Sequence, residues 1–412
     1  DPDSVGQRYA IRALDVVWML PPFWFRNLRG QLRIVGDTLW VDDAHFNLAR
    51  SAARGTAHVM WGGVAPVRYD IRLQSDTLAF TDLAWIHPAI PRSGGGRTAF
   101  TMRNNARDLT IMEYGVQAMD VSTLQSRVTG RMTFGVGGPV LRLTDMDLAL
   151  QPAHTALLRH FNGGPFPYDW QGVLRGRIVA RGGPVTAFDV DQATLTYEDA
   201  HVRGARSTAT ISGRLNVERP SKTVLHQAQV QIAALDLRTP QYVNPAFPRL
   251  RGMVRGTMRL DSLWDDARFS ALDVEHVDGP GVASRFTGSG RYTLAPSGVR
   301  FDVDVQASPF SYTTFSRSYP DFPLRGTAIG PIRAAGVADD FGLQLALAGA
   351  GGELAFDGRA MVRDSLLGGT GPFTVRGGNL QTLFGTSSWP TSSLDVTGDV
   401  ALTGRSIPSI RG

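Results

Sequence analysis

A phrase that recurs at even spacing constrains this chain more than any other feature of its sequence. NPAFPRLRG ends at Gly252, SYPDFPLRG ends at Gly326, and PFPYDWQGVLRG ends earlier, at Gly176. These copies of a proline and aromatic cluster, each closed by Leu-Arg-Gly, end 76 and 74 residues apart. Self-similarity at a fixed period indicates one supersecondary unit that repeats and stacks on its neighbour.

Further copies extend this period toward both ends of the chain. PPFWFRNLRG ends at Gly30, and SSWPTSSLDVTG ends at Gly398 with Thr in place of Arg. A weaker copy up to Arg103 has the proline pair without Leu-Arg-Gly. A proline and aromatic cluster is also a common entry to a strand, but this does not explain the even spacing. We predict one elongated array over residues 1–412, with about six repeats of ~75 residues and turns near Gly30, Arg103, Gly176, Gly252, Gly326 and Gly398.

Alternation of apolar and polar residues predicts strands inside each repeat. From Arg68 to Gln74, apolar residues occupy every second position and polar or charged residues occupy the others. This period of two gives a strand one apolar face and one solvated face. Glycine and proline punctuate the chain, and helix-length amphipathic stretches are nearly absent. We predict an all-β protein, an elongated repetitive antiparallel sheet of about 34 strands with short helical turns between repeats.

The sequence leaves open what covers the apolar face. Segments such as Leu235 to Val243 and Leu380 to Ser388 are long enough for only a turn or two of helix. The sheet therefore either closes as a sandwich or barrel, or curls into a U-shaped, taco-like trough with an apolar lining. The in-phase apolar residues line the core in the first case and the groove in the second: Leu32, Ile34, Tyr69, Ile71, Leu73, Leu141, Leu143, Met258, Leu260, Phe301, Val303, Val305, Leu343, Leu345 and Leu347.

Composition and motifs point away from catalysis and nucleic acid. The net charge is +5, but arginines alternate with apolar residues and no basic run reaches four, so we predict no nucleic-acid partner. The eight histidines show no metal-ligand spacing, and the chain has no cysteine. GVGGP at Gly135 precedes no helical pattern, so it indicates a turn and not a phosphate site. We predict no enzyme activity, no cofactor and no metal.

The ends of the chain indicate that it is a piece of a longer protein. It begins with DPDSVGQRYA, without Met and without the features of a signal peptide. The most apolar stretch, from Leu14 to Phe25, is short and is interrupted by Pro21 and Pro22, so it does not predict a membrane span. The absence of cysteine suits an oxidising compartment of the cell envelope.

The repeats resemble those of a known family. The stretch LDLRTPQYVNPAFPRLRGMVRGTMRLDSLWDDARFSALDVEHV, from Leu235 to Val277, is similar to the repeating unit of AsmA/TamB-like envelope proteins, and the same order of elements recurs before and after it. The resemblance implies a long taco-like sheet whose groove carries phospholipid acyl chains. It also implies a place in the periplasm of a Gram-negative-type bacterium, a tether to the inner membrane outside this sequence, and partner proteins in the inner and outer membranes.

A second hypothesis makes the array a periplasmic scaffold that docks on an integral membrane complex and carries nothing. Repeat arrays suit extended contacts with a partner. Aromatic residues near the proline turns are the candidate anchors if they are exposed, and end caps of the β layers if they pack over the groove edge. They are Trp18, Phe23, Trp24, Phe25, Trp170, Tyr242, Phe310 and Tyr312.

Overall fold

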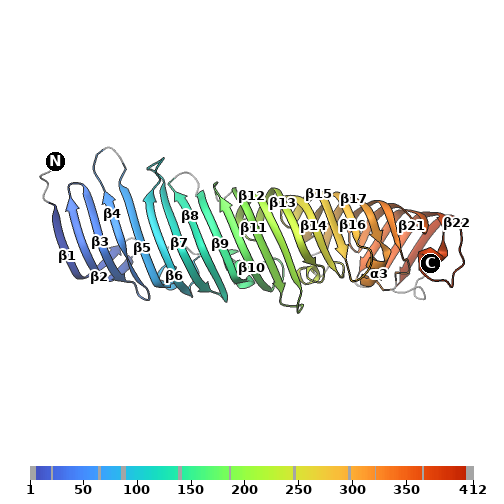
Figure 1. Ribbon diagram of the computed structural model, residues 1–412, viewed down its shortest axis with the longest axis horizontal. Helices are drawn as coiled ribbons and strands as arrows, with labels where there is room; N and C mark the ends of the chain where they lie inside the picture. Colours follow the sequence, from blue (N-terminus) through green and yellow to red (C-terminus); the bar gives the residue numbers. More distant parts are fainter. Residues whose placement is uncertain are drawn as a thin grey trace. The chain divides into compact units, whose positions relative to one another are not determined.

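The protein is all-β and forms one antiparallel sheet of 22 strands that does not close into a barrel. The computed structural model describes residues 6–19, 22–63, 66–84, 90–137, 142–184, 187–244, 247–295, 298–320, 322–363 and 366–404. The chain divides into two compact units. The first contains Asp1–Pro165, Val173–Leu195 and Leu215–Pro220, and the second contains Phe166–Gly172, Thr196–Arg214 and Ser221–Gly412. Within each unit, successive strands lie side by side in chain order (Figure 1).

The strands are long, which explains why there are 22 and not about 34 as the sequence predicted. The first eleven are β1 (Gln7–Met19), β2 (Pro22–Val35), β3 (Thr38–Asn47), β4 (Ala52–Met60), β5 (Arg68–Ala79), β6 (Gly95–Asn104), β7 (Met112–Thr123), β8 (Ser126–Val136), β9 (Arg142–His154), β10 (Gly172–Arg181) and β11 (Phe188–Asp199). The others are β12 (Arg206–Arg219), β13 (Lys222–Asp236), β14 (Met253–Leu263), β15 (Asp266–Val277), β16 (Ser284–Ala295), β17 (Gly298–Ser311), β18 (Thr327–Val337), β19 (Asp340–Gly349), β20 (Gly352–Arg363), β21 (Leu366–Gly378) and β22 (Leu394–Gly404).

Short helical segments interrupt the strands with the period of the sequence repeat. They are η1 (Phe80–Asp82), α1 (Thr155–Phe161), α2 (Pro240–Val243), α3 (Tyr312–Ser318) and α4 (Leu380–Phe384). Four strands lie between each helical segment and the next. Because neighbouring strands are antiparallel, all five segments follow strands that end at the same edge of the sheet, which we call the helix edge. We call the other long edge the opposite edge.

Two of the six predicted turn positions lie at the helix edge, and the other four lie inside strands. Gly252 and Gly326 directly precede β14 and β18. Gly30, Gly176 and Gly398 lie inside β2, β10 and β22, four or more residues beyond the start of each strand. Arg103 lies near the end of β6, at the opposite edge, so the weak sixth copy is the one whose predicted turn lies farthest from the helix edge.

Bulges and glycines inside the strands give the sheet its bend. β3, β7, β13 and β15 each carry a register shift at a residue other than glycine with φ between 48° and 50°, and these residues are Asp43, Ala118, Gln227 and Ala271. Such bulges bend a strand and increase its twist. At Gly288, which pairs with Leu272 beside the bulge in β15, an added Cβ would collide with the backbone oxygen of Asp304. Glycine is therefore required where these bent strands approach one another.

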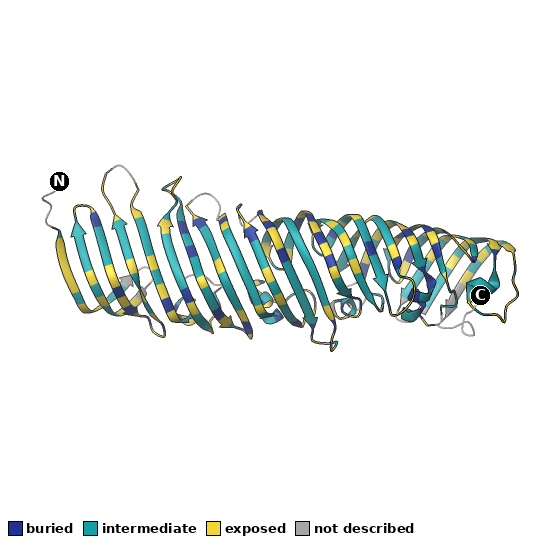
Figure 2. Cartoon of the chain, viewed as in Figure 1, coloured by how far each residue is buried: buried dark blue, intermediate teal, exposed yellow. Residues whose placement is uncertain are grey.

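Alternation along the strands divides the sheet into two faces with different exposure (Figure 2). In β17, Phe301, Val303 and Val305 are half-buried, whereas Asp302 and Asp304 between them are exposed. Fully packed clusters on the apolar face are small. One joins Leu143, Ala180, Phe188, Val190 and Ala193, and the other joins Tyr312, Ala328 and Leu347. The packed core thus occupies only part of the apolar face among the described residues.

Candidate functional site: the apolar face of the sheet

Strand pairing in the first unit gathers the predicted apolar residues into rows across the sheet. Leu32, Ile71 and Leu143 belong to one row, although 111 residues of sequence separate the first from the last. The row runs from β1 to β9 through Tyr9, Leu32, Val41, Ala57, Ile71, Met102, Tyr114, Phe134 and Leu143. Two parallel rows contain Ile34 with Tyr69, and Leu73 with Phe100. Leu141 lies outside the described residues.

The second unit repeats this arrangement on β17 to β21. Val305 pairs with Ile332, which pairs with Leu345, and the row continues through Phe356 to Phe373. A neighbouring row joins Val303 and Leu343 through Ala334. Phe301 belongs to a third row, where its ring meets that of Phe341 at 5.2 Å between centroids. Met258 and Leu260 lie on β14, opposite Val230 and Ala228.

Exposure distinguishes two parts of this apolar face. Leu347 and Leu143 are 2% and 3% exposed, as in a packed core. Most of the other predicted residues, including Leu343 and Leu345, are only half-buried. Buried side chains in a closed sandwich are largely removed from solvent. The half-buried rows therefore form an apolar surface that solvent reaches, and this surface is the candidate site.

Leu347 is buried by a short segment that we call the cover, which consists of α3 and the loop after it. Tyr312, the first residue of α3, packs with Ala328 and Leu347, and Phe322 and Leu324 from the following loop pack against the same cluster. Ser311 caps the N-terminus of this helix, because its hydroxyl accepts a hydrogen bond from the backbone N–H of Thr314. The cover stays near the helix edge, because α3 is only seven residues long. Leu343 is four residues from Leu347 on the same face of β19 and lies farther from the helix edge.

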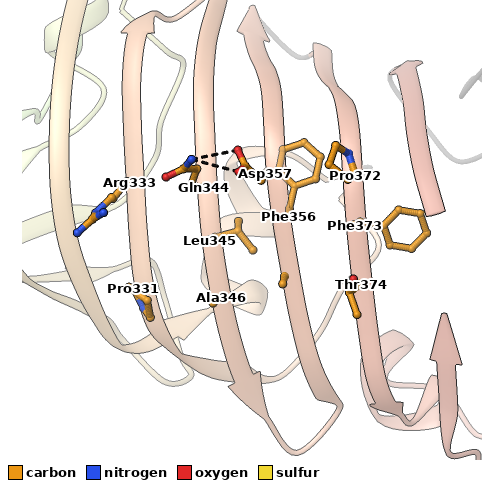
Figure 3. Close-up of a pocket in the computed structure, with 11 residues that line it drawn as sticks. Pro331, Arg333, Gln344, Leu345, Ala346, Phe356, Asp357, Pro372, Phe373 and Thr374 are labelled. Atoms are coloured by element: carbon orange, nitrogen blue, oxygen red, sulfur yellow. Dashed lines mark hydrogen bonds between the residues drawn. The ribbon is translucent and has the colours of Figure 1, made fainter. Parts of the chain in front are cut away.

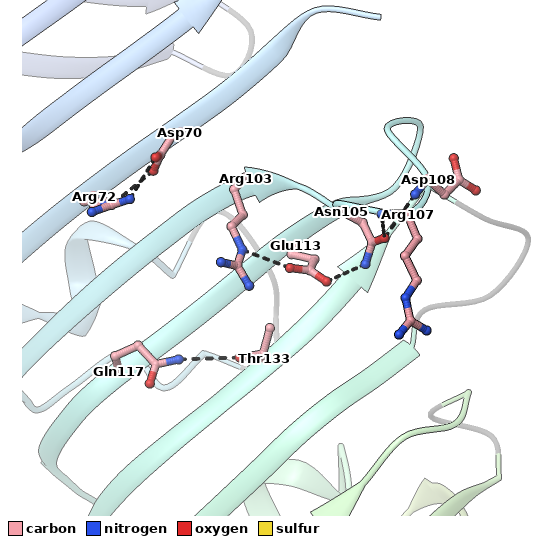
Figure 4. Close-up of polar contacts among 9 residues, drawn as sticks. All are labelled: Asp70, Arg72, Arg103, Asn105, Arg107, Asp108, Glu113, Gln117 and Thr133. Carbon is pink, nitrogen blue, oxygen red and sulfur yellow. Dashed lines mark hydrogen bonds and ion pairs between the residues drawn. The ribbon is translucent and has the colours of Figure 1, made fainter.

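Arginine and carboxylate pairs cover the polar face. Arg72 bonds Asp70, and Arg103 bonds Glu113 at 3.0 Å (Figure 4). Elsewhere a two-pronged hydrogen bond from Arg177 lowers the pKa of Asp147 below its usual value. Since much of the positive charge is paired with neighbouring carboxylates, this face presents a mixed surface and not a basic patch.

A hollow lies on this polar face and not on the apolar rows. It measures about 580 Å³ and is lined by residues of β18 to β21 (Figure 3). Most of its lining residues are in phase with Arg333, Gln344 and Asp357, and the side-chain amide of Gln344 donates to Asp357 at 3.1 Å. Leu345, Phe356 and Phe373 alternate with these residues, so their side chains belong to the opposite face. The hollow is shallow and lies on the face opposite the apolar rows, so it does not define the candidate site.

The predicted partner-contact aromatics divide into packed and exposed side chains. Tyr312 is 5% exposed and packs with Ala328 and Leu347, as expected of an end cap and not of an exposed anchor. Phe310 packs on its ring, and Phe25 packs edge-on against Phe46. Trp170 stacks on Phe166 and lies 5.5 Å from Trp264 between ring centroids. Exposed rings are Trp24 and Tyr242, at 52% and 38%. The side chains of Trp18 and Phe23 lie outside what the structure describes.

Sequence reasoning missed the residues that reach over the apolar face. Phe322 and Leu324 belong to the predicted turn of the repeat, and Phe166, Tyr168 and Trp264 are not among the predicted site residues. The signal was present in the repeat itself, because a proline and aromatic cluster follows each of the helices α1, α2, α3 and α4. Pattern alone does not say how far such a loop reaches.

No family model, curated protein or solved structure matches this chain. The likeness to AsmA/TamB-like repeats therefore rests on the order of residues in the repeats. Among the residues that the structure describes, there is no helix with the length and hydrophobicity needed to cross a membrane.

Proposed function

We propose that the half-buried apolar rows form a groove that shields phospholipid acyl chains, in a non-enzymatic protein of the bacterial periplasm that carries lipid between the inner and outer membranes. The observation that supports this most is the continuity of the rows. Apolar side chains face the same way on nine successive strands of the first unit and on β17 to β21 of the second. A groove with this lining holds an acyl chain without specific contacts, because each buried methylene contributes about 0.8 kcal/mol.

The polar face complements this role. Many of its arginines pair with carboxylates and yet remain largely exposed, for example 65% for the side chain of Arg177. Such a surface stays hydrated and discourages association of one sheet with another. Lipid head groups would remain in water at the mouth of the groove, while the acyl chains lie against the apolar rows.

The alternative function, a scaffold that docks on an integral membrane complex, is favoured by the exposed rings of Trp24 and Tyr242. Aromatic side chains of this kind are common anchors at protein interfaces. In that case the apolar rows contact no lipid.

Photo-crosslinking distinguishes the two functions. A photoreactive amino acid is placed at Leu343 or Leu345 in the groove, and at Gln344 between them on the polar face. Each protein is mixed with vesicles of phosphatidylethanolamine and phosphatidylglycerol and irradiated, and adducts are identified by mass spectrometry. We expect phospholipid adducts at positions 343 and 345 and none at 344.

Position 347 supplies a second control, because Leu347 faces the same way but is covered. Weak labelling there, with strong labelling at 343, is the result expected of an open groove. Equal labelling at 343 and 344, or none at either, would contradict the lipid function and leave the scaffold.

A further inference from the structure

In the second unit, a residue in a connection at the helix edge contacts the opposite edge of the sheet. Asn244 directly follows α2 at the helix edge, and its side-chain amide donates to the backbone oxygen of Ala295 at 2.9 Å. Ala295 ends β16 at the opposite edge. Strands of 11 or 12 residues separate such edges by about 35 Å in a flat sheet. The edges are therefore close enough here for the connection that follows β13 to reach from one edge to the other.

A second contact between the edges is made by a short segment, residues 166–171, that we call the aromatic strap. Its C-terminal part is held at the helix edge, where the hydroxyl of Tyr197 donates to the backbone oxygen of Gln171 at 2.7 Å and the ring of Trp170 lies against that of Tyr197. Its middle reaches the opposite edge, where the hydroxyl of Tyr168 donates to the backbone oxygen of Leu294 at 2.9 Å. Six residues span at most about 20 Å, so both edges lie within reach of the strap.

Aromatic packing supports the contact between the strap and the opposite edge. The rings of Phe166, Tyr168 and Trp170 all lie within 6.2 Å of the ring of Trp264, measured between centroids. Trp264 lies in the turn between β14 and β15, and its backbone oxygen accepts a hydrogen bond from the hydroxyl of Tyr292. Tyr168 is only 7% exposed. The strap is thus joined to the opposite edge by both a hydrogen bond and a packed cluster.

We propose that the aromatic strap is a closed lateral gate over the groove at β14 to β16, and that lipid enters or leaves this stretch sideways only when the strap opens. This inference rests on the proposed function, since it regulates access to the same apolar face. While the strap is closed, acyl chains pass beneath it along the rows that contain Met258 and Leu260. Opening requires the hydrogen bond from Tyr168 to Leu294 to break, and the ring cluster around Trp264 to separate.

The gate is tested without lipid by thiol labelling, because the chain has no cysteine of its own. Met258→Cys places a thiol on the apolar face, and Arg259→Cys places one on the exposed polar face beside it. The rate of reaction with a bulky maleimide is measured for each, with and without Tyr168→Phe. This substitution keeps the ring and removes the donor to Leu294, so we expect labelling at 258 to become about fivefold faster and labelling at 259 to stay unchanged.

A stronger variant, Tyr168→Phe with Asn244→Ala, removes the hydrogen bonds that these two side chains donate to the opposite edge and should accelerate labelling at 258 further. Circular dichroism confirms that each variant is folded. If labelling at 258 is equally fast in all folded variants, the strap does not gate the groove and the inference is overturned.

A lipid-transfer assay distinguishes a failure of this inference from a failure of the proposed function. Protein loaded with a fluorescent phospholipid is mixed with acceptor vesicles, and the rate of transfer is followed. Faster transfer by Tyr168→Phe at equal loading supports the gate. Equal transfer rates at equal loading overturn the gate and leave the lipid function standing. If no variant loads lipid, the proposed function fails, and the labelling rates still decide whether the strap opens.

Discussion

Leu347 and Leu343 lie on the same face of the same strand, four residues apart, yet one belongs to a core and the other to a surface. Leu347 is 2% exposed under Tyr312, whereas Leu343 is half-buried. Their chemistry and strand are identical, so the difference comes from the reach of α3 and the loop after it. A β-rich repeat can therefore build a core and an open apolar surface from one pattern, by limiting the length of its cover.

This difference also explains how the sheet remains open without a large core. A cover of a few residues per repeat buries apolar side chains near the helix edge, as Ala328 and Leu347 show. Stability in such arrays is approximately a sum of local and neighbour terms, so each repeat needs only a small packed cluster of its own. The remaining rows are then free for another use.

The largest effect on the free energy of unfolding is expected when Leu347 and Leu343 are each replaced by alanine. Leu347→Ala removes buried methyl groups from a packed cluster and leaves a cavity, which should cost about 3 kcal/mol. Leu343→Ala removes half-exposed groups and should cost about 1 kcal/mol or less. Urea unfolding followed by circular dichroism measures both.

Hydrogen exchange at the amides of α3 provides the local control for this pair. Leu347→Ala should speed exchange in α3, since the helix rests on that residue, and Leu343→Ala should leave it unchanged. Equal costs for the two substitutions would contradict the division into covered and open parts.

A smaller effect on stability is expected from substituting a glycine where the sheet bends to make the open rows a groove. Gly288 and Gly298 have nearly the same φ, 150° and 152°, but an added Cβ at Gly288 meets the backbone of β17 and one at Gly298 meets nothing within 4 Å. Gly288→Ala should therefore be less stable than Gly298→Ala by about 1–3 kcal/mol. Both substitutions introduce the same backbone strain, because the two φ angles are nearly equal. A difference between the urea midpoints of the two variants therefore measures the steric effect of the close approach at Gly288. Equal midpoints would mean that contact between β16 and β17 does not constrain the bend.

Much of the fold could be predicted from the sequence, because its strongest signals are local. Alternation from Arg68 to Gln74 predicted both faces of β5, and the spacing of Gly252 and Gly326 matches the placement of α2 and α3 before β14 and β18. The predicted number of about 34 strands was wrong, because glycine and proline were interpreted as punctuation between short strands, whereas glycines such as Gly288 lie inside longer ones.

The candidate site was predictable only in part. The rows follow from alternation and pairing, so Val305 and Leu345 were identified as members of one face. Burial of Tyr312 and the reach of Tyr168 to Leu294 depend on contacts between distant residues. The curvature of the sheet brings those residues together. No local sequence pattern predicts this curvature, because it results from many small bends in successive strands.

The smallest effect is expected from alkaline pH, which should weaken the cover and spare the open rows. Burial raises the pKa of Tyr312 above its usual value of 10.0, and it raises the pKa of Tyr319 in the same cover. A tyrosine whose pKa is higher in the folded state stabilises the fold fully below pH 10, and this contribution is lost as the pH rises through the folded pKa. The urea midpoint should therefore fall above pH 10.

Phenylalanine substitutions assign this loss to the cover. Tyr312→Phe and Tyr319→Phe keep the packed rings and remove the groups that ionise, so the double variant should lose less stability than the unmodified chain when the pH is raised above 10. Among the described residues the buried hydroxyl of Tyr319 has no hydrogen-bond partner, so its removal should cost nothing at neutral pH. Tyr242→Phe, on an exposed ring, serves as the control and should follow the unmodified chain. If the double variant loses as much stability above pH 10 as the unmodified chain does, ionisation of Tyr312 and Tyr319 is not the cause of the loss. The covered and open parts would then respond to pH alike.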